Sequence, residues 1–264
     1  MVNQEARACK AWELLTRVAR SKRFVTYQEL AAALGTHHRA DRFVLGLIQD
    51  YCLKEKLPPL TILVVNKHTG KPGSGFIGCS NESLDEGVNG VRGYDWSKAP
   101  NPFSYAADGT AAASLIKQLL KSPESSKDVY AKVKVRGQQQ SMFRSVLMEA
   151  YEGRCAVTGL SFEQTLDACH IIPWSQCGPE LRMNPLNGIL MSCLLHRLFD
   201  LGHLRLDEDY RIYFKLKESE LESPENRAFV KNYHGKRIRL PKSKSLWPRK
   251  DLIQKRNNAP SKSE

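Results

Sequence analysis

Apolar residues in the first forty positions recur at helical spacing. Residues 6–19 place an apolar stripe on one helical face, formed by Trp12, Leu15, Val18 and Ala19. A second helix should begin after Thr26, because Thr26 followed three residues later by Glu29 has the pattern of a capping box. Gly35 supplies the expected left-handed end of that helix. The chain is therefore predicted to start with two helices.

A third helix and a short strand should follow. The helix is predicted over residues 39–54, with an apolar side formed by Phe43, Leu47 and Tyr51. Two consecutive prolines break this pattern, and residues 61–65, TILVV, are apolar and β-branched as in a strand. The sequence NKHTGKPGSG, at 66–75, then has the composition of a turn. Three helices followed by a short hairpin are the pattern of a winged helix.

Winged-helix domains often bind DNA through the third helix. Arg39 and Arg42 would then be the candidate DNA contacts, although contact with a protein or a scaffolding role also suits this part of the chain. The stretches VTYQELAAALG and LPPLTILVVNKHTGKPG are weakly similar to the DNA-binding domain of the alkyltransferase-like proteins. The reactive cysteine of alkyltransferases has no counterpart, because the matching region reads Pro-Pro-Leu-Thr, so alkyl transfer is not implied.

Composition divides the chain into three predicted parts. Residues 1–97 form the winged-helix-like targeting domain. Residues 98–136 are rich in Pro, Ser, Ala and Gln and form a linker with one helix, at 110–120. Residues 137–264 form a third part, in which an apolar stripe at 140–151 predicts a helix. The fold class is predicted to be α+β.

The composition is that of a globular protein. The chain has 264 residues, of which 41% are hydrophobic and 26% charged. It has no run of eighteen apolar residues and no apolar segment behind a basic start, so we expect neither membrane insertion nor a signal peptide, and a cytoplasmic location. Its seven cysteines include no Cys-x-x-Cys pair, which argues against a disulfide framework and the commonest zinc modules.

The net charge of +12 points to an anionic partner. Residues 231–262 carry eleven Lys or Arg and one Asp, with Tyr233, His234 and Trp247 among them. Basic side chains with interleaved aromatics suit a nucleic-acid backbone and its bases. A solvated tail that keeps the protein soluble is the alternative. The candidate nucleic-acid contacts in this run are Lys236, Arg237, Arg239, Lys242 and Lys244.

Polar residues with catalytic potential gather between positions 165 and 200. The stretch TLDACHIIPW reads as a strand that carries His170 to its end before the chain turns. The sequence NPLNGILMSCLLHRLFDLG then supplies Asn187, a second strand, and a helix that presents His196. The order of strand with histidine, loop with asparagine, strand, and helix with histidine is the ββα arrangement of metal-dependent nucleases.

The chain therefore resembles the HNH, or ββα-metal, endonuclease family, in its bacterial restriction and defence branch. The five motifs that carry the resemblance are CAVTG, HIIPW, NGIL, HRLFD and HGKRIRLP, and they lie in this order between about 137 and 240. The resemblance thus implies that residues 137–264 are an HNH nuclease domain with a basic C-terminal tail. The resemblance implies that His170 is the general base that activates water. It implies that Asn187 orders the site and orients that histidine, and that His196 is a metal ligand. It also implies one divalent cation, Mg²⁺ or Mn²⁺, and DNA as the substrate.

Two departures from the family pattern affect the metal sites. The residue before His170 is Cys169, where many members have Asp or His as a second ligand. Asp167 lies on the same side of the strand, and a carboxylate suits Mg²⁺ better than a thiolate does, so Asp167 is the expected ligand. The structural zinc of other members needs four ligands. In this chain Cys155 occupies one of those four positions, and Thr158, Ser192 and Leu195 occupy the other three. No structural zinc is expected.

Three functions are compatible with this sequence. The first is a metal-dependent DNA endonuclease of a restriction or anti-phage defence system, with partner proteins of that system. The second is a DNA-binding protein whose nuclease core has decayed, which Cys169 makes conceivable. The third is a nuclease directed at RNA, since basic charge alone does not separate DNA from RNA.

Overall fold

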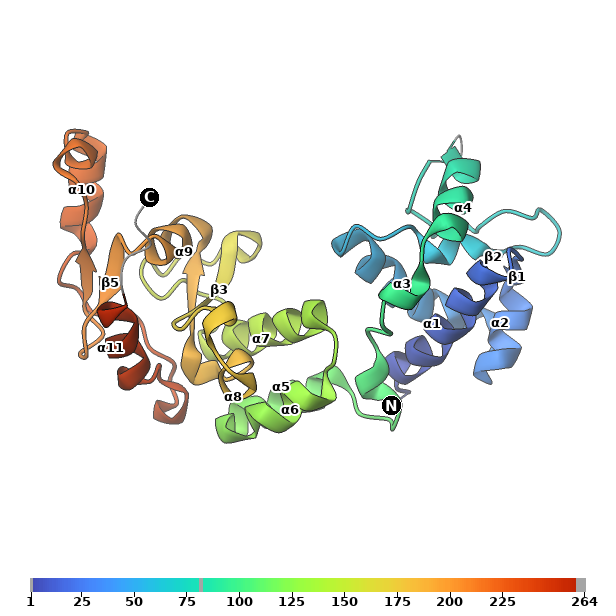
Figure 1. Ribbon diagram of the computed structural model, residues 1–264, viewed down its shortest axis with the longest axis horizontal. Helices are drawn as coiled ribbons and strands as arrows, with labels where there is room; N and C mark the ends of the chain where they lie inside the picture. The colour runs from blue at the N-terminus through green and yellow to red at the C-terminus, as the bar shows by residue number, and fades with distance from the viewer. Residues whose placement is uncertain (1, 81–82, 260–264) are drawn as a thin grey trace. The chain divides into compact units, whose positions relative to one another are not determined.

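The computed structural model describes residues 2–80 and 83–259, which form two compact units (Figure 1). Unit 1 comprises residues 1–114 and 133–138, and unit 2 comprises residues 115–132 and 139–264. The segment 98–136 thus contributes to both units. None of the described helices is long and apolar enough to cross a membrane.

Unit 1 is built on three helices, α1 (Gln4–Arg20), α2 (Tyr27–Leu34) and α3 (Asp41–Lys54), with α4 (Leu84–Gly93) after them. The predicted stripe of the first helix is buried at Trp12, Leu15 and Ala19. The Trp12 ring packs edge-on against Tyr51 and Trp96, with centroid distances of 5.6 and 5.8 Å. This aromatic cluster stabilises the core of the unit, since large buried rings contribute most apolar area.

The second helix begins and ends as its sequence predicts. The Thr26 side chain accepts a hydrogen bond from the Glu29 backbone N–H, and the Glu29 carboxylate accepts one from the Thr26 N–H, at 2.7 Å. Gly35 follows the helix at φ +62°, in the left-handed region that glycine adopts without strain. Both boundaries are set by contacts within four residues, so the sequence alone determines them.

The predicted third helix and strand are only partly correct. Helix α3 starts at Asp41, and Arg39 lies in a preceding 3₁₀ turn, His38–Ala40. The apolar stripe is shifted by one residue: Val44, Ile48 and Cys52 are buried, whereas the side chain of Phe43 is 52% exposed. The prediction for Phe43 was therefore wrong, because helical spacing fits two adjacent stripes equally well.

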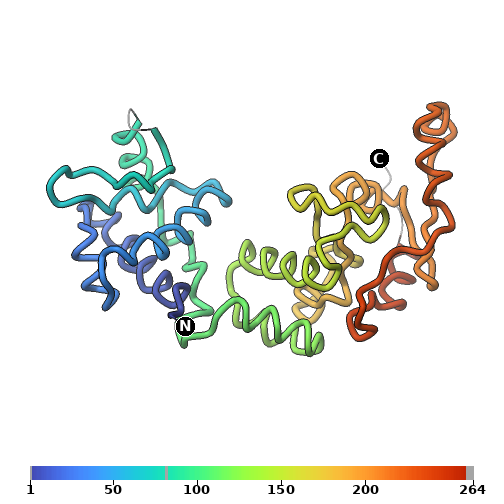
Figure 2. The backbone as a smooth tube through the Cα atoms, turned by 180° about the vertical axis from the view of Figure 1, so that it is seen from behind, coloured from blue at the N-terminus to red at the C-terminus, as the bar shows by residue number. Residues whose placement is uncertain are grey.

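The expected hairpin is replaced by a different pairing. Residues Leu60–Leu63 form a 3₁₀ helix, and only Val64–Val65 form a strand, β2. It pairs in parallel with β1, Val25–Thr26, from before the second helix. The turn at 66–75, drawn in teal in Figure 2, follows β2, and the Asn66 N–H donates to the Lys71 backbone oxygen at 2.9 Å. An antiparallel wing is not formed within the described residues of this unit, and membership of the winged-helix class stays a prediction.

Unit 2 is centred on a two-stranded antiparallel sheet with helices packed around it. Strand β3 (Leu166–His170) pairs with β4 (Gly188–Ser192), and helix α9 (Cys193–Asp200) follows β4 directly and packs on both strands. Helix α7 (Arg136–Ala150) covers the sheet with the buried side chains of Phe143 and Leu147 (Figure 1). The ββα order read from the sequence is therefore present.

The remaining elements of unit 2 surround this centre. Helices α5, α6 and α8 precede or interrupt it, and a second antiparallel pair, β5 with β6, follows α9. Helix α11 packs against β5. The bounds are α5 Ala112–Lys121, α6 Ser126–Lys132, α8 Pro179–Arg182, β5 Leu204–Leu206, β6 Ile212–Phe214, α10 Pro224–Tyr233 and α11 Lys250–Asn258.

Candidate functional site

Strand β3 and helix α9 place His170 and His196 on the lining of one hollow. His170 is the last residue of β3 and pairs with Gly188, the first residue of β4. A Cβ atom at Gly188 would lie 2.6 Å from a Leu147 methyl group and 2.7 Å from the Phe143 ring. Only glycine therefore allows helix α7 to approach this closely, and that approach brings the Phe143 ring to His170.

The His170 ring is fixed on several sides. It stacks on Phe143 with 4.1 Å between ring centroids and meets Trp174 edge-on at 5.7 Å. Its Nε2 lies 2.9 Å from the backbone oxygen of Arg182. A carbonyl oxygen can only accept, so Nε2 carries the proton and Nδ1 keeps a free lone pair. Burial lowers the pKa of His170 below the ordinary value of 6.5, which keeps the ring neutral at physiological pH.

Asn187 is fully buried and organises the loop between the strands. Its Oδ1 accepts a hydrogen bond from the Ile172 N–H at 2.8 Å. Its Nδ2 donates to the backbone oxygens of Ile172 and Leu181, each at 3.2 Å. Leu181 directly precedes Arg182, whose carbonyl oxygen accepts the hydrogen bond from His170 Nε2. Asn187 therefore acts on His170 through the backbone it ties together.

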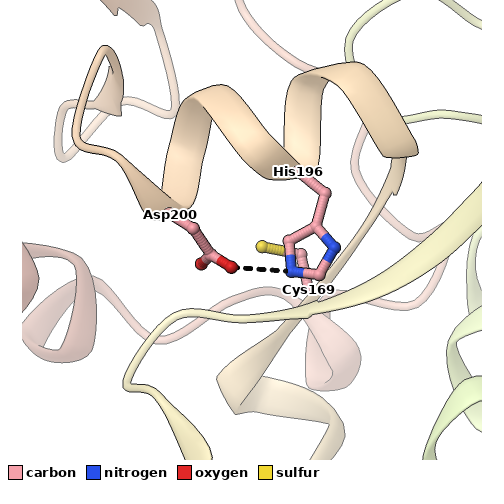
Figure 3. Close-up of side chains that lie close together, drawn as sticks. All are labelled: Cys169, His196 and Asp200. Atoms are coloured by element: carbon pink, nitrogen blue, oxygen red, sulfur yellow. Dashed lines mark ion pairs between the residues drawn. The ribbon is translucent and has the colours of Figure 1, made fainter.

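His196 lies between two carboxylates. Its Nδ1 is 3.1 Å from Asp167, and its Nε2 is 3.3 Å from Asp200, one helical turn further along α9. Figure 3 shows the Asp200 carboxylate aimed at the imidazole, with the Cys169 thiol behind it. Potential ligand atoms of Cys169, His196 and Asp200 lie within 4.8 Å of one another. The sequence prediction missed Asp200, although the spacing of four residues from His196 signals a shared helix face.

The carboxylates and the thiol differ in access. A hollow of about 390 Å³ is lined by Asp167, His170, His196 and Asp200, and Cys169 is not part of its lining. Cys169 is 0% exposed, and burial raises the pKa of its thiol well above 9. The thiol is therefore neutral, whereas the two carboxylates and the two imidazoles face the same hollow.

This set of side chains fits a hard divalent cation. Carboxylate oxygens and a neutral imidazole are suitable ligands for Mg²⁺ or Mn²⁺, and a protonated thiol is not. An imidazole binds a metal through one nitrogen, and its other N–H commonly donates to a carboxylate. One of Asp167 and Asp200 would then share the ion with His196, and the other would hold the ring. Cys169 would become a ligand only for a softer metal.

Arg256 ties the site together from helix α11. Its guanidinium donates to the backbone oxygen of Ile171 at 2.7 Å and to that of Phe199, and it lies 3.6 Å from an Asp200 oxygen. It also covers the Phe199 ring at 3.7 Å. The backbone after β3 and the end of helix α9 are thus held by one guanidinium group, whose side chain is 14% exposed. Its distance from them in the sequence explains why sequence analysis missed it.

Of the four positions that would hold a structural zinc in other family members, Cys155 and Leu195 are buried in the core, and Thr158 and Ser192 are half-buried. The sulfur of Cys155 is buried and accepts weak hydrogen bonds from the backbone N–H groups of Thr158, at 3.5 Å, and Ser192, at 3.4 Å. Leu195 belongs to the same apolar cluster. Cys155 therefore has contacts of a structural, buried thiol at this position.

The candidate nucleic-acid residues are exposed in both units. In unit 1, Arg39 and Arg42 are exposed, and the Arg42 guanidinium lies 4.7 Å from the ring of Phe43. In unit 2, the basic run is a docked segment, because Ile238 and Leu246 are buried within it. Residues 260–262 of the run lie outside the described residues. Its five candidate cations, Lys236, Arg237, Arg239, Lys242 and Lys244, are all exposed.

Some of these cations already have partners. Lys242 pairs with the carboxylate of Glu152. The cationic groups of Arg237 and Lys244 lie 5.4 and 5.8 Å from the ring centroid of Trp247. A solubilising tail would not need such contacts, whereas cations held on a fixed surface can meet a regular row of phosphates.

Comparison with known proteins agrees with this geometry. Residues 155–207 match the family model described as HNH endonuclease. The matched range contains β3, β4 and α9, with His170, Asn187 and His196 among its residues. None of the curated proteins matches the chain. The family match covers this segment alone, and it supports the presence of an HNH endonuclease domain.

Proposed function

From the HNH endonuclease domain at 155–207, we propose that this protein is a metal-dependent endonuclease that hydrolyses phosphodiester bonds in DNA. One observation carries the proposal. His170 lines the same hollow as His196 and two carboxylates. Its imidazole is neutral, is held by the Arg182 carbonyl oxygen, and has a free lone pair on Nδ1. A base and a set of cation ligands around one cavity are the two parts that hydrolysis of an anionic ester requires.

The residues divide the chemistry between them. His170 Nδ1 accepts the proton of the attacking water, and its Nε2 remains bonded to the Arg182 carbonyl so that the ring stays oriented. Asn187 holds that carbonyl in place. His196 and Asp167 would hold the cation, and Asp200 would accept a hydrogen bond from the other imidazole nitrogen. When bound, a divalent cation would neutralise phosphate charge and stabilise the leaving oxygen.

The proposed partner is DNA, bound mainly by the basic side chains. Exposed cations on unit 2 would contact phosphates, and unit 1 would select the target through Arg39 and Arg42. Such a division of labour suits a restriction or anti-phage defence enzyme. Replacing Lys236 and Arg239 by Gln should then weaken binding to all DNA sequences alike, and should flatten the slope of log affinity against log salt by about 0.9 per lost contact.

A nicking assay tests the proposed activity. Supercoiled plasmid is incubated with the full chain and Mg²⁺ or Mn²⁺, with the metal omitted in parallel, and RNA is tested alongside. His170→Ala should abolish nicking while retaining DNA binding. His203→Ala is the matched control and should cut normally, because His203 belongs to the same unit and lies outside both the hollow and the basic run. Cutting by His170→Ala would contradict the assignment, and binding without cutting by the wild type would favour a decayed nuclease.

A further inference from the structure

A second cavity lies beside the proposed catalytic hollow. It has a volume of about 620 Å³ and shares Pro173 and Asp200 with that hollow, so the two cavities adjoin at these residues. Its volume is within the range of pockets that enclose small organic molecules, roughly 300–1,000 Å³. Neither the proposed base nor His196 lines it. A group bound here would therefore lie next to the reacting phosphate without taking part in the reaction.

The cavity carries an excess of positive charge. Arg205 is held by the backbone oxygens of Gly202, at 3.4 Å, and Asn257, at 3.3 Å, and neither contact neutralises its charge. Arg197 and Lys255 also line the cavity, and no ion pair of either is found among the described residues. The single carboxylate of the lining, Asp200, is engaged by Arg256 and His196. A negatively charged ligand would therefore be favoured.

The rest of the lining is apolar or carries amides. Ile172, Pro173 and Leu201 supply apolar surface, and the side chains of Gln176 and Asn258 can donate and accept hydrogen bonds. A nucleotide offers the matching combination of a flat apolar ring, a polar ring edge and a phosphate. A bare phosphate would leave the apolar surface and the amides unused. The chemistry of the lining thus selects a nucleotide over a simple anion.

We propose that this cavity binds the nucleotide adjacent to the cleaved phosphodiester in the DNA strand. The proposal rests on the proposed function and deepens it, since it names the part of the substrate that the second cavity holds. In duplex DNA this nucleotide has to leave the base stack, which is easiest at a weakened base pair. The enzyme would then discriminate between bases at this one position.

The phosphate contact can be tested without catalysis. Binding of a labelled duplex is measured by fluorescence anisotropy in EDTA for the full chain and for Arg197→Gln combined with Lys255→Gln. The log–log salt slope should fall by about 0.9 for each phosphate contact that is lost. Lys121→Gln combined with Lys127→Gln removes the same charge from exposed positions outside the cavity and is the matched control. A slope equal to that of the control would overturn the proposal.

The base contact is tested with 2-aminopurine, whose fluorescence rises when it leaves the stack. After the cut position has been mapped, the analogue is placed singly at each nucleotide around it. At one position next to the cut, the fluorescence of 2-aminopurine should rise when the wild-type protein binds. It should not rise with Ala259→Trp, which places a large side chain in the lining of the cavity. Equal, dark signals at all flanking positions would overturn the proposal. A protein that binds DNA but never cuts would instead refute the proposed function, and the salt slope would still report on the cavity.

Discussion

Replacing Asn187 by Ala should loosen the loop that carries the His170 contact. The substitution removes three hydrogen bonds in a fully buried position, one accepted from Ile172 and two donated to Ile172 and Leu181. The Ile172 N–H and carbonyl oxygen would lose these partners, whereas the Leu181 carbonyl oxygen would keep the hydrogen bond that it accepts from the Asn184 N–H at 3.3 Å.

The expected loss of stability follows from these groups. An unsatisfied buried donor or acceptor costs about 1–3 kcal/mol. The Ile172 N–H is the most costly, because the hydrogen bond it loses is the shortest of the three at 2.8 Å. The two carbonyl oxygens add about 1 kcal/mol each, since oxygens retain other lone pairs for weak contacts. Asn187→Ala should therefore lower the free energy of unfolding of unit 2 by roughly 3–5 kcal/mol.

Two measurements check this value. Hydrogen exchange at the Ile172 amide should accelerate locally, and urea unfolding of unit 2 should shift to lower concentration. Asn184→Ala is the matched control, because Asn184 is buried in the same loop and its side chain makes one hydrogen bond, to the Leu186 N–H at 3.0 Å. It should cost about 1 kcal/mol. Equal losses for the two variants, or unchanged exchange at Ile172, would refute the reasoning.

Three further outcomes are expected. Burial lowers the pKa of His170, so this imidazole stays neutral as pH falls through 6.5. The rate of single-turnover cleavage at saturating metal should therefore decline only below that pH, and a decline centred above 6.5 would contradict this. Asp167→Asn should weaken Mg²⁺ binding, measured by calorimetry, more than Cys169→Ser, and the opposite ranking would make the thiol the ligand. Arg39→Ala with Arg42→Ala should reduce target preference in a competition assay more than the turnover number, and unchanged preference would favour protein docking by unit 1.

The parts of the fold that depend on near neighbours could be predicted. The capping box of Thr26 and Glu29 fixes the start of α2 through atoms three residues apart. The segment 61–65 could not be assigned in the same way, because its β-branched residues fit a strand while the unit folds Leu60–Leu63 into a 3₁₀ turn. Whether Val64 pairs with a following strand or with Val25 depends on tertiary contacts that no local pattern contains.

The candidate site was predictable to a similar degree. The order of His170, Asn187 and His196 along the chain indicated which side chains the ββα elements would bring together. The hydrogen bond from His170 to the Arg182 carbonyl, which fixes the tautomer of the base, was not predictable, because a backbone oxygen has no sequence signature. Asp200 was predictable in principle from its spacing, since residues four apart share a helix face.

The clamp formed by Arg256 has a consequence for the time at which the site is completed during synthesis. Arg256 follows Phe199 by 57 residues, and it bonds to the backbone at both ends of the site. At about 5–20 residues per second, a ribosome needs roughly 3–11 s to add those residues. The growing chain therefore contains both histidines before Arg256, which binds the backbone of Ile171 and Phe199, has been added. The backbone at the two ends of the candidate site should therefore reach its final geometry only after residue 256 has been added.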